Sequence, residues 1–140
     1  MVAGAVLFAG CGAGGDGGTT AAQRPAEEVV AVAADYYGAF SDQDGRAACS
    51  HMTGEAMRGF VVDFAALGEG LDCAATLEAV IDLYGPDDHA LLDKALAGLS
   101  PDDVNVEGAR ATVSLPKGKA LRLRQIDGAW YVSDTDTTGG

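Results

Sequence analysis

Residues 104–133 read VNVEGARATVSLPKGKALRLRQIDGAWYVS, and this stretch decides the fold. Apolar and polar side chains alternate through it with a period of two, which indicates β-strands that bury one face. The alternation predicts four strands, at residues 104–107, 109–115, 119–126 and 129–133. Because short loops join them, consecutive strands are expected to pair antiparallel and to form a meander. One face of that sheet is apolar and must be covered by the rest of the chain.

The loops between the strands predict which residues pair. Asp127-Gly128 is typical of a two-residue type I′ turn, which places Leu123 opposite Val132. The segment Pro116–Gly118 fits a three-residue loop in which Gly118 adopts a left-handed conformation. A two-residue loop there would mix the apolar and polar faces of the two strands, whereas a three-residue loop keeps them apart.

The first hairpin is expected to turn at Glu107-Gly108, which pairs Val106 with Ala109. With these three turns, all four strands contribute apolar residues to one face. That face is predicted to consist of Val104, Val106, Ala109, Ala111, Val113, Leu115, Leu121, Leu123, Trp130 and Val132.

Before residue 104, apolar residues recur with the period of about 3.6 that indicates helices. Pro25 suits the first position of a helix, Thr53 and Asp72 suit N-caps, and Gly85 and Gly98 suit helix ends. The predicted helices cover residues 25–40, 47–51, 53–67, 72–84 and 86–97. The expected fold class is therefore α+β, with N-terminal helices packed on one face of a C-terminal four-stranded antiparallel meander.

The length and charge of the chain restrict its class. Its 140 residues correspond to one domain, which we place at residues 25–134, followed by a tail at 135–140 that we expect to be disordered. The 21 acidic residues outnumber the 9 basic ones, giving a formal charge of −12. A chain with this charge is repelled by nucleic acid, so a general nucleic-acid binder is excluded. No stretch approaches the roughly 20 apolar residues of a membrane-spanning helix.

The amino end resembles an export signal. Residues 2–10 are uncharged and mostly apolar, and Leu7–Cys11 resembles a bacterial lipobox, in which cleavage before the Cys lets its thiol carry a diacylglycerol. Residues 1–11 are thus predicted to be a lipoprotein signal peptide with Cys11 as the lipid attachment site, and the Gly-rich residues 12–24 a flexible tether. The expected location is the outer face of the cell membrane, in the cell envelope. The alternatives are a secreted protein that keeps Cys11, or a frayed apolar terminus.

The cysteine count agrees with export. Setting Cys11 aside leaves an even pair, Cys49 and Cys73, which in an exported chain indicates a disulfide bond. The alternative is two buried thiols. No Cys-x-x-Cys or paired His spacing accompanies the pair, so we expect no metal and no cofactor.

Several motifs together resemble a known family. They are Tyr36–Phe40 in the first helix, Ala47–Cys49, Thr53–Glu55, Cys73, and the Asp127–Val132 hairpin. The chain is similar in these features, over about residues 26–134, to the small NTF2-like lipoproteins of actinobacteria. The resemblance implies a roll, in which a curved antiparallel sheet wraps on helices with a pocket between them. The wider superfamily contains isomerases, cyclases, dehydratases and proteins of no known activity, so the fold leaves the function open.

The pocket implied by this resemblance would be lined by aromatic residues. The candidates are Tyr36, Tyr37, Phe40, Phe64 and Trp130. Polar groups that could act inside it are found at Tyr36, Tyr37, His51, Asp63 and Tyr84, although aromatic residues at helical spacing are typical of an ordinary core. No pair among them has the spacing of a carboxylate dyad or of a nucleophile with its base, so we expect no enzymatic activity.

Charge is distributed unevenly along the chain. Residues 26–103 carry 16 acidic and three basic residues, whereas residues 104–133 carry five basic and two acidic ones. The predicted register places Arg110, Arg122, Arg124 and Tyr131 together on the outer face of the sheet. This face is either a solvated surface that keeps the sheet from pairing edge to edge, or a contact for an anionic protein partner or a second copy.

The sequence therefore supports two hypotheses. The first is a membrane-anchored envelope lipoprotein whose NTF2-like domain binds an unknown partner without catalysis. The second is a small-ligand-binding or isomerase-type protein that uses a cavity between sheet and helices. A solvent-connected cavity with converging polar groups would distinguish them.

Overall fold

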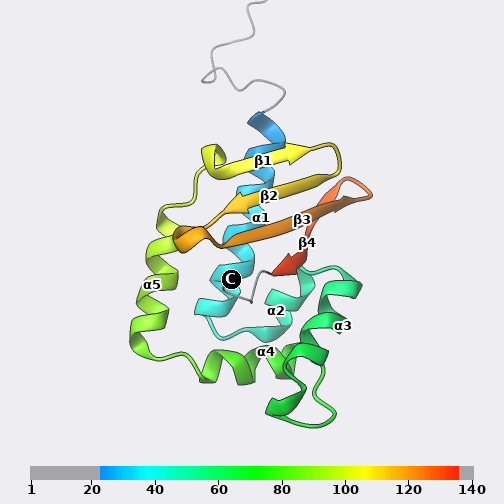
Figure 1. Cartoon of the computed structure of the whole chain (residues 1–140), viewed down its shortest axis with the longest axis vertical. Helices are drawn as coiled ribbons and strands as arrows, with labels where there is room; N and C mark the ends of the chain where they lie inside the picture. Colours follow the sequence, from blue (N-terminus) through cyan, green and yellow to red (C-terminus); the bar gives the residue numbers. More distant parts are fainter. Residues whose placement is uncertain (1–22, 136–140) are drawn as a thin grey trace, which may run out of the picture.

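The computed structural model describes residues 23–135 of the chain. Five α-helices precede a four-stranded sheet (Figure 1). The helices are α1 (Gln23–Ser41), α2 (Gly45–Ser50), α3 (Gly54–Asp63), α4 (Cys73–Asp82) and α5 (Pro86–Ala97). The strands are β1 (Val104–Glu107), β2 (Arg110–Ser114), β3 (Ala120–Ile126) and β4 (Ala129–Thr135). The α+β class and the order of helices before sheet are those predicted.

Three helices begin at side chains that satisfy backbone N–H groups of the first turn. Carboxylate oxygens of Asp44 and Asp72 accept from the N–H groups of residues 47 and 75 at 3.0 and 2.8 Å. The Thr53 hydroxyl accepts from the N–H of residue 56 at 3.0 Å. These caps, each contributing about 1 kcal/mol, fix where α2, α3 and α4 start.

The sheet is an antiparallel meander with the order β1-β2-β3-β4. Asp127 and Gly128 both have positive φ angles, 51° and 83°, as a type I′ turn requires, and Leu123 pairs with Val132. Gly118 has a φ of 72°, and the short 3-10 turn Pro116–Gly118 connects β2 to β3. Both of these loop predictions are confirmed.

The first hairpin differs from the prediction. Its turn lies at Gly108 and Ala109, so Glu107 pairs with Arg110 and Val106 pairs with Ala111 rather than with Ala109. Gly108 has a φ of 60° and takes the first central position of the turn, where glycine is favoured. The pairing is shifted by two residues, so the side chains of both strands keep their predicted faces. The exception is Ala109, which lies in the exposed turn.

Some helix bounds also differ. The helix after Thr53 ends at Asp63 and is followed by a separate 3-10 turn, Ala65–Leu67, instead of continuing to residue 67. The next helix ends at Asp82 rather than at residue 84, and the first begins at Gln23, two residues before Pro25. A proline within the first turn is tolerated because its missing N–H has no partner in the helix.

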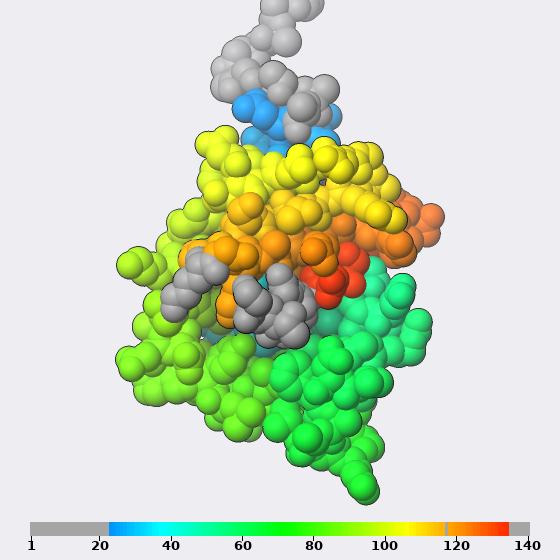
Figure 2. Space-filling model, viewed as in Figure 1, coloured from blue at the N-terminus to red at the C-terminus, as the bar shows by residue number. Residues whose placement is uncertain are grey.

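The core lies between the sheet and the helices. Figure 1 shows α1 crossing behind the four strands, with its C-terminal end reaching α5. Leu121, Leu123 and Val132 on the inner face are almost completely buried, whereas Arg122 and Arg124 are exposed. Figure 2 shows the outer face of the strands, in yellow to red, at the surface of the molecule. The apolar and polar positions that alternate in the sequence are therefore the buried and exposed positions of the strands.

Two side chains on opposite faces of β3 test this one-sided packing. We expect Leu123→Ala, which empties a fully buried site, to lower the free energy of unfolding by about 2–5 kcal/mol. The matched control is Ile126→Ala on the outer face of the same strand, where the side chain is 41% exposed, and it should cost less than about 1 kcal/mol. Denaturant unfolding of both variants gives the two values, and equal losses would contradict the assignment of faces.

Candidate functional site

A large cavity opens between α1, α4, α5 and the loop from β2 to β3. Its volume is about 1060 Å³. Most of its lining is apolar, and six of the nine aromatic residues of the chain contribute to it. These aromatic residues are Tyr36, Tyr37, Phe40, Phe60, Phe64 and Tyr84.

Helix α1 supplies one aromatic wall. Tyr36, Tyr37 and Phe40 lie on its C-terminal half, and the i, i+4 spacing of Tyr36 and Phe40 places these two on one face. The ring centroid of Tyr36 lies 5.1 Å from that of Tyr37 and 5.2 Å from that of Phe40, with interplanar angles of 64° and 71°. Tyr36 is only 1% exposed, so this wall forms the deep part of the cavity.

Helix α5 forms the opposite wall and is loosely attached. Leu91, Leu92 and Leu96 line the cavity from positions that a helix brings to one side. No residue of α5 is buried, and Leu91 is 53% exposed. The hydrogen bond from the Ser41 hydroxyl to the Asp93 carboxylate, 2.8 Å long and exposed, ties α5 to the end of α1. Leu92 is half-buried and packs against the core, and the apolar side of α5 also borders the cavity.

Charged groups are confined to the outer parts of the lining. Asp88, Lys94 and Lys119 line the cavity and are exposed, while Asp103 is half-buried. One Asp88 oxygen accepts from the Gly85 N–H at 2.9 Å and so caps α5. The deep polar groups are instead the phenols of Tyr36 and Tyr37, which are neutral hydrogen-bonding groups.

Burial keeps these phenols protonated. It raises the pKa of Tyr36 well above its usual value, with the nearby Tyr37 and Tyr84 adding to the effect. Burial, with a further contribution from Tyr84, raises the pKa of Tyr37 to about 12. The pKa of Tyr84 is also raised, first by burial and then by the charge of Asp88. At neutral pH the cavity thus presents three O–H groups that can donate hydrogen bonds.

Four of the five residues that we assigned to a pocket line this cavity, and Trp130 does not. Trp130 pairs with Gln125 beside the Asp127-Gly128 turn, whereas the cavity lies at the other end of β3, next to Ala120. Trp130 is buried in the core on the inner face of the sheet. Trp130 therefore lies away from this cavity, because residues on one face of a sheet can lie at opposite ends of its strands.

The leucines of α5 and Phe60 line the cavity but were not among the residues predicted to do so. Periodicity indicated only that the leucines are apolar and lie on one side of a helix, which describes a core helix equally well. The sequence does contain one indication that α5 differs from a core helix. Gly85 and Gly98 flank α5, so the chain at both of its ends lacks side chains that would attach it to the rest of the domain. Tyr84 was considered as a polar group for the interior and does line the cavity.

The outer face of the sheet carries Arg110, Arg122, Arg124 and Tyr131. Arg124 pairs with Arg110 on one side and with Tyr131 on the other. Arg122 is in an ion pair with Asp134, at 2.9 Å between Nη1 and Oδ2, and both side chains are more than half exposed. Such an exposed pair contributes little to stability, but it offsets the charge of one of the three arginines.

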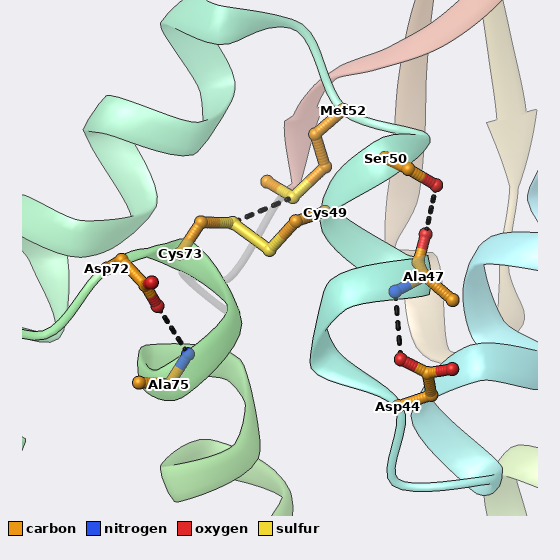
Figure 3. The surroundings of a disulfide bond; sticks show 8 residues. All are labelled: Asp44, Ala47, Cys49, Ser50, Met52, Asp72, Cys73 and Ala75. Carbon is orange, nitrogen blue, oxygen red and sulfur yellow. Dashed lines mark hydrogen bonds between the residues drawn. A yellow bond between two sulfur atoms is a disulfide. The ribbon is translucent and has the colours of Figure 1, made fainter.

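A disulfide bond joins Cys49 of α2 to Cys73 of α4, with 6.2 Å between the Cα atoms (Figure 3). Met52 Sδ lies 4.0 Å from Cys73 Sγ. The two helices pack closely here, because a Cβ on Gly45 would clash with the carbonyl oxygen of Ala74. The bond therefore fixes α4, one wall of the cavity, to the rest of the helices.

The other polar candidates lie outside the cavity. Asp63 lines a separate pocket of about 290 Å³ with Glu55 and Asp134. His51 ends α2, and its carbonyl accepts from the Val132 N–H at 2.7 Å. Within residues 23–135, no cluster of His, Cys, Asp and Glu is arranged to hold a metal ion. Cys11, the predicted lipid attachment site, lies outside the described residues.

Comparison with known proteins adds no neighbour to this description. The chain matches no protein-family model, no curated protein and no solved structure. In the described part of the chain, no helix has the length and apolar character needed to cross a membrane.

The raised pKa of Tyr37 predicts a loss of stability in alkali. The pKa of Tyr37 is about 12 in the folded state and about 10 in the unfolded state. The stabilisation that comes from keeping this phenol neutral and buried is therefore fully present below pH 10, and it is lost as the pH rises towards 12. We expect the free energy of unfolding to fall over this window, and to fall less in Tyr37→Phe, which has no phenol at this position to ionise. Urea unfolding at a series of pH values measures both slopes, and identical slopes would contradict the burial of this phenol.

Proposed function

We propose that the cavity binds a small organic molecule with a mainly apolar body. The observation that carries the proposal is a space of about 1060 Å³ lined by six aromatic side chains. Ligand pockets typically measure about 300–1000 Å³ and combine apolar walls with a few polar groups, as this one does. Of our two hypotheses from the sequence, the cavity favours the second, in its ligand-binding form.

The packing of α5 supports this proposal. Protein interiors are normally filled to the density of organic crystals, and a void with apolar walls forfeits the contacts that its lining would otherwise make. The leucines of α5 border this void, and no residue of α5 is buried. A bound apolar molecule would add contacts to those that Leu92 of α5 already makes with the core.

The lining favours binding over catalysis. Its deep polar groups are tyrosines whose raised pKa values make them poor proton donors and acceptors at neutral pH. They can orient an acceptor atom of a ligand without transferring a proton to it. We therefore propose a non-enzymatic role, with Tyr36 and Tyr37 as positioning groups.

We also propose that the domain is exported and held at the outer face of the cell membrane by a lipid on Cys11, as an NTF2-like lipoprotein of the cell envelope. The disulfide between Cys49 and Cys73 supports an oxidising compartment, since such bonds are rare in reducing ones. The remaining support is the lipobox-like sequence before Cys11 and the Gly-rich stretch after it. A tethered domain of this kind could present its cavity to molecules near the membrane.

Diphenylhexatriene, a neutral apolar dye that fluoresces when it leaves water, tests the binding proposal. We expect saturable binding to the purified domain, and slower hydrogen exchange in α5 when the dye is bound, because the helix then gains packing partners. Ala95→Trp places an indole in the cavity lining and should weaken binding at least about ten-fold.

The matched control is Ala97→Trp, two residues along the same helix, where the side chain is exposed and does not line the cavity. It should bind the dye as the unsubstituted domain does. Absence of saturable binding, or an equal loss in both tryptophan variants, would overturn the proposal.

Anchoring is tested separately in a bacterial host that processes lipoproteins. We expect the full chain to fractionate with membranes and to carry a diacylglyceryl adduct on Cys11 in intact-mass analysis, since two acyl chains give stable attachment. Cys11→Ser should be released from the membrane fraction. Retention of that variant in membranes, or a mass without the adduct, would contradict the lipid anchor.

A further inference from the structure

The cavity is bordered by an acidic part of the chain. Residues 82–103, which run from the end of α4 through α5 to the start of β1, contain six aspartates and one lysine. The whole chain has a formal charge of −12. A field of this sign attracts cations towards the opening and repels anions from it.

The interior is suited to the same kind of ligand. It offers aromatic rings and neutral phenols, and its charged lining residues are confined to Asp88, Lys94, Asp103 and Lys119. The face of an aromatic ring attracts an organic cation, and more strongly where water is partly excluded. An anion inside the cavity would meet the negative faces of the rings and would lose its hydration.

Tyr84 and Asp88 mark the place where a positive charge is best accommodated. Both line the cavity near the first turn of α5, and the Tyr84 ring is 41% exposed. The two residues are four positions apart in the sequence and line the same cavity. Burial raises the pKa of Tyr84, and the charge of Asp88 adds to this effect. Asp88 has one oxygen engaged by the Gly85 N–H, and its second oxygen has no hydrogen-bond partner within residues 23–135.

The lysines of the lining lie further from this place. Lys94 is six residues beyond Asp88 on α5, which corresponds to about 9 Å along the helix axis. Lys119 follows the β2–β3 loop, in a different part of the lining, and half-buried Asp103 also lies away from the first turn of α5. A cation beside Tyr84 and Asp88 therefore gains attraction without a lysine or arginine on the same turn. The imidazole on that turn is His89, whose ring centroid lies 6.2 Å from that of Tyr84.

From this arrangement, and resting on the proposed ligand-binding function, we infer that the cavity takes a hydrophobic cation: an organic ammonium whose apolar body fills the aromatic interior and whose charge lies at the Tyr84–Asp88 end of the mouth. Deep Tyr36 and Tyr37 then contact the apolar body. The charge stays at the rim, where it remains partly hydrated.

Three dyes with the same diphenylhexatriene body test this inference. One is neutral, one carries a trimethylammonium group and one carries a propionate. We expect the cationic dye to bind about five-fold more tightly than the neutral one and the anionic dye to bind most weakly. The preference for the cation should decrease as salt is added, because the mouth is exposed to solvent.

Two substitutions locate the charge. Asp88→Asn keeps an oxygen that can cap α5, and it should reduce the preference for the cationic dye to near two-fold. Tyr84→Leu should also reduce this preference. Both variants should still bind the neutral dye. The control Glu27→Gln makes the same change of net charge at an exposed position of α1, outside the lining, and should keep the five-fold preference.

The outcomes separate the two proposals. If none of the three dyes binds, the proposed function fails. If the neutral dye binds as tightly as the cation or more tightly, or if Glu27→Gln reduces the preference as much as Asp88→Asn does, the domain binds apolar ligands but the inference about a cation is wrong.

Discussion

The structure depends on covering one apolar face of a short sheet. Leu121, Leu123 and Val132 are removed from water because the helices, α1 among them, cover the inner face of the strands. Burial of this kind is the main favourable contribution to folding, at roughly 25 cal/mol per Å² of apolar surface, and it has no directional requirement of its own. The turns determine which side chains are buried, because each turn fixes the register of two strands and so decides which side chains point towards α1. The parallel bridge between Met52 and Val132 then joins the helical part of the chain to the last strand.

The same arrangement accounts for the cavity. The sheet has four strands, and α1 has 19 residues, so the aromatic C-terminal half of α1 continues to where the inner face of the sheet no longer covers it. Helices α4 and α5 approach this half from the side, but α5 contributes no buried residue. Two adjoining regions result: a filled core between sheet and helices, and a partly open one among the helices and the β2–β3 loop. The residues of both regions are apolar, and only their positions relative to the sheet distinguish them.

The difference between the filled core and the open cavity explains which features of the fold and of the candidate site could be predicted from the sequence. Period-two alternation and turn residues predicted the faces of the sheet, and the two-residue shift at Gly108 left those faces intact because side-chain direction repeats every two residues. The disulfide between Cys49 and Cys73 was predicted once Cys11 was set aside, because these two cysteines then form a pair. By contrast, Trp130 and Phe64 look alike in sequence, as aromatic residues that face inward, yet one is in the core and the other lines the cavity. Whether an apolar residue meets a partner or a void depends on the lengths and crossing of elements far apart in the chain, which local patterns do not report.

The two helical walls of the cavity are held in very different ways. Helix α4 is fixed at its start by the Cys49–Cys73 bond, which contributes about 2–4 kcal/mol, and by the Asp72 cap, while Leu77 and Ile81 are fully buried along its length. Helix α5 has the exposed Ser41–Asp93 hydrogen bond, worth about 1 kcal/mol, and glycines at both ends. Local opening follows the weakest set of contacts, so α5 can separate from the body while α4 and the sheet stay in place. Movement of α5 would therefore open the aromatic wall of α1 to a ligand at a small cost in stability, because α5 lines the cavity and contributes no buried residue to the core.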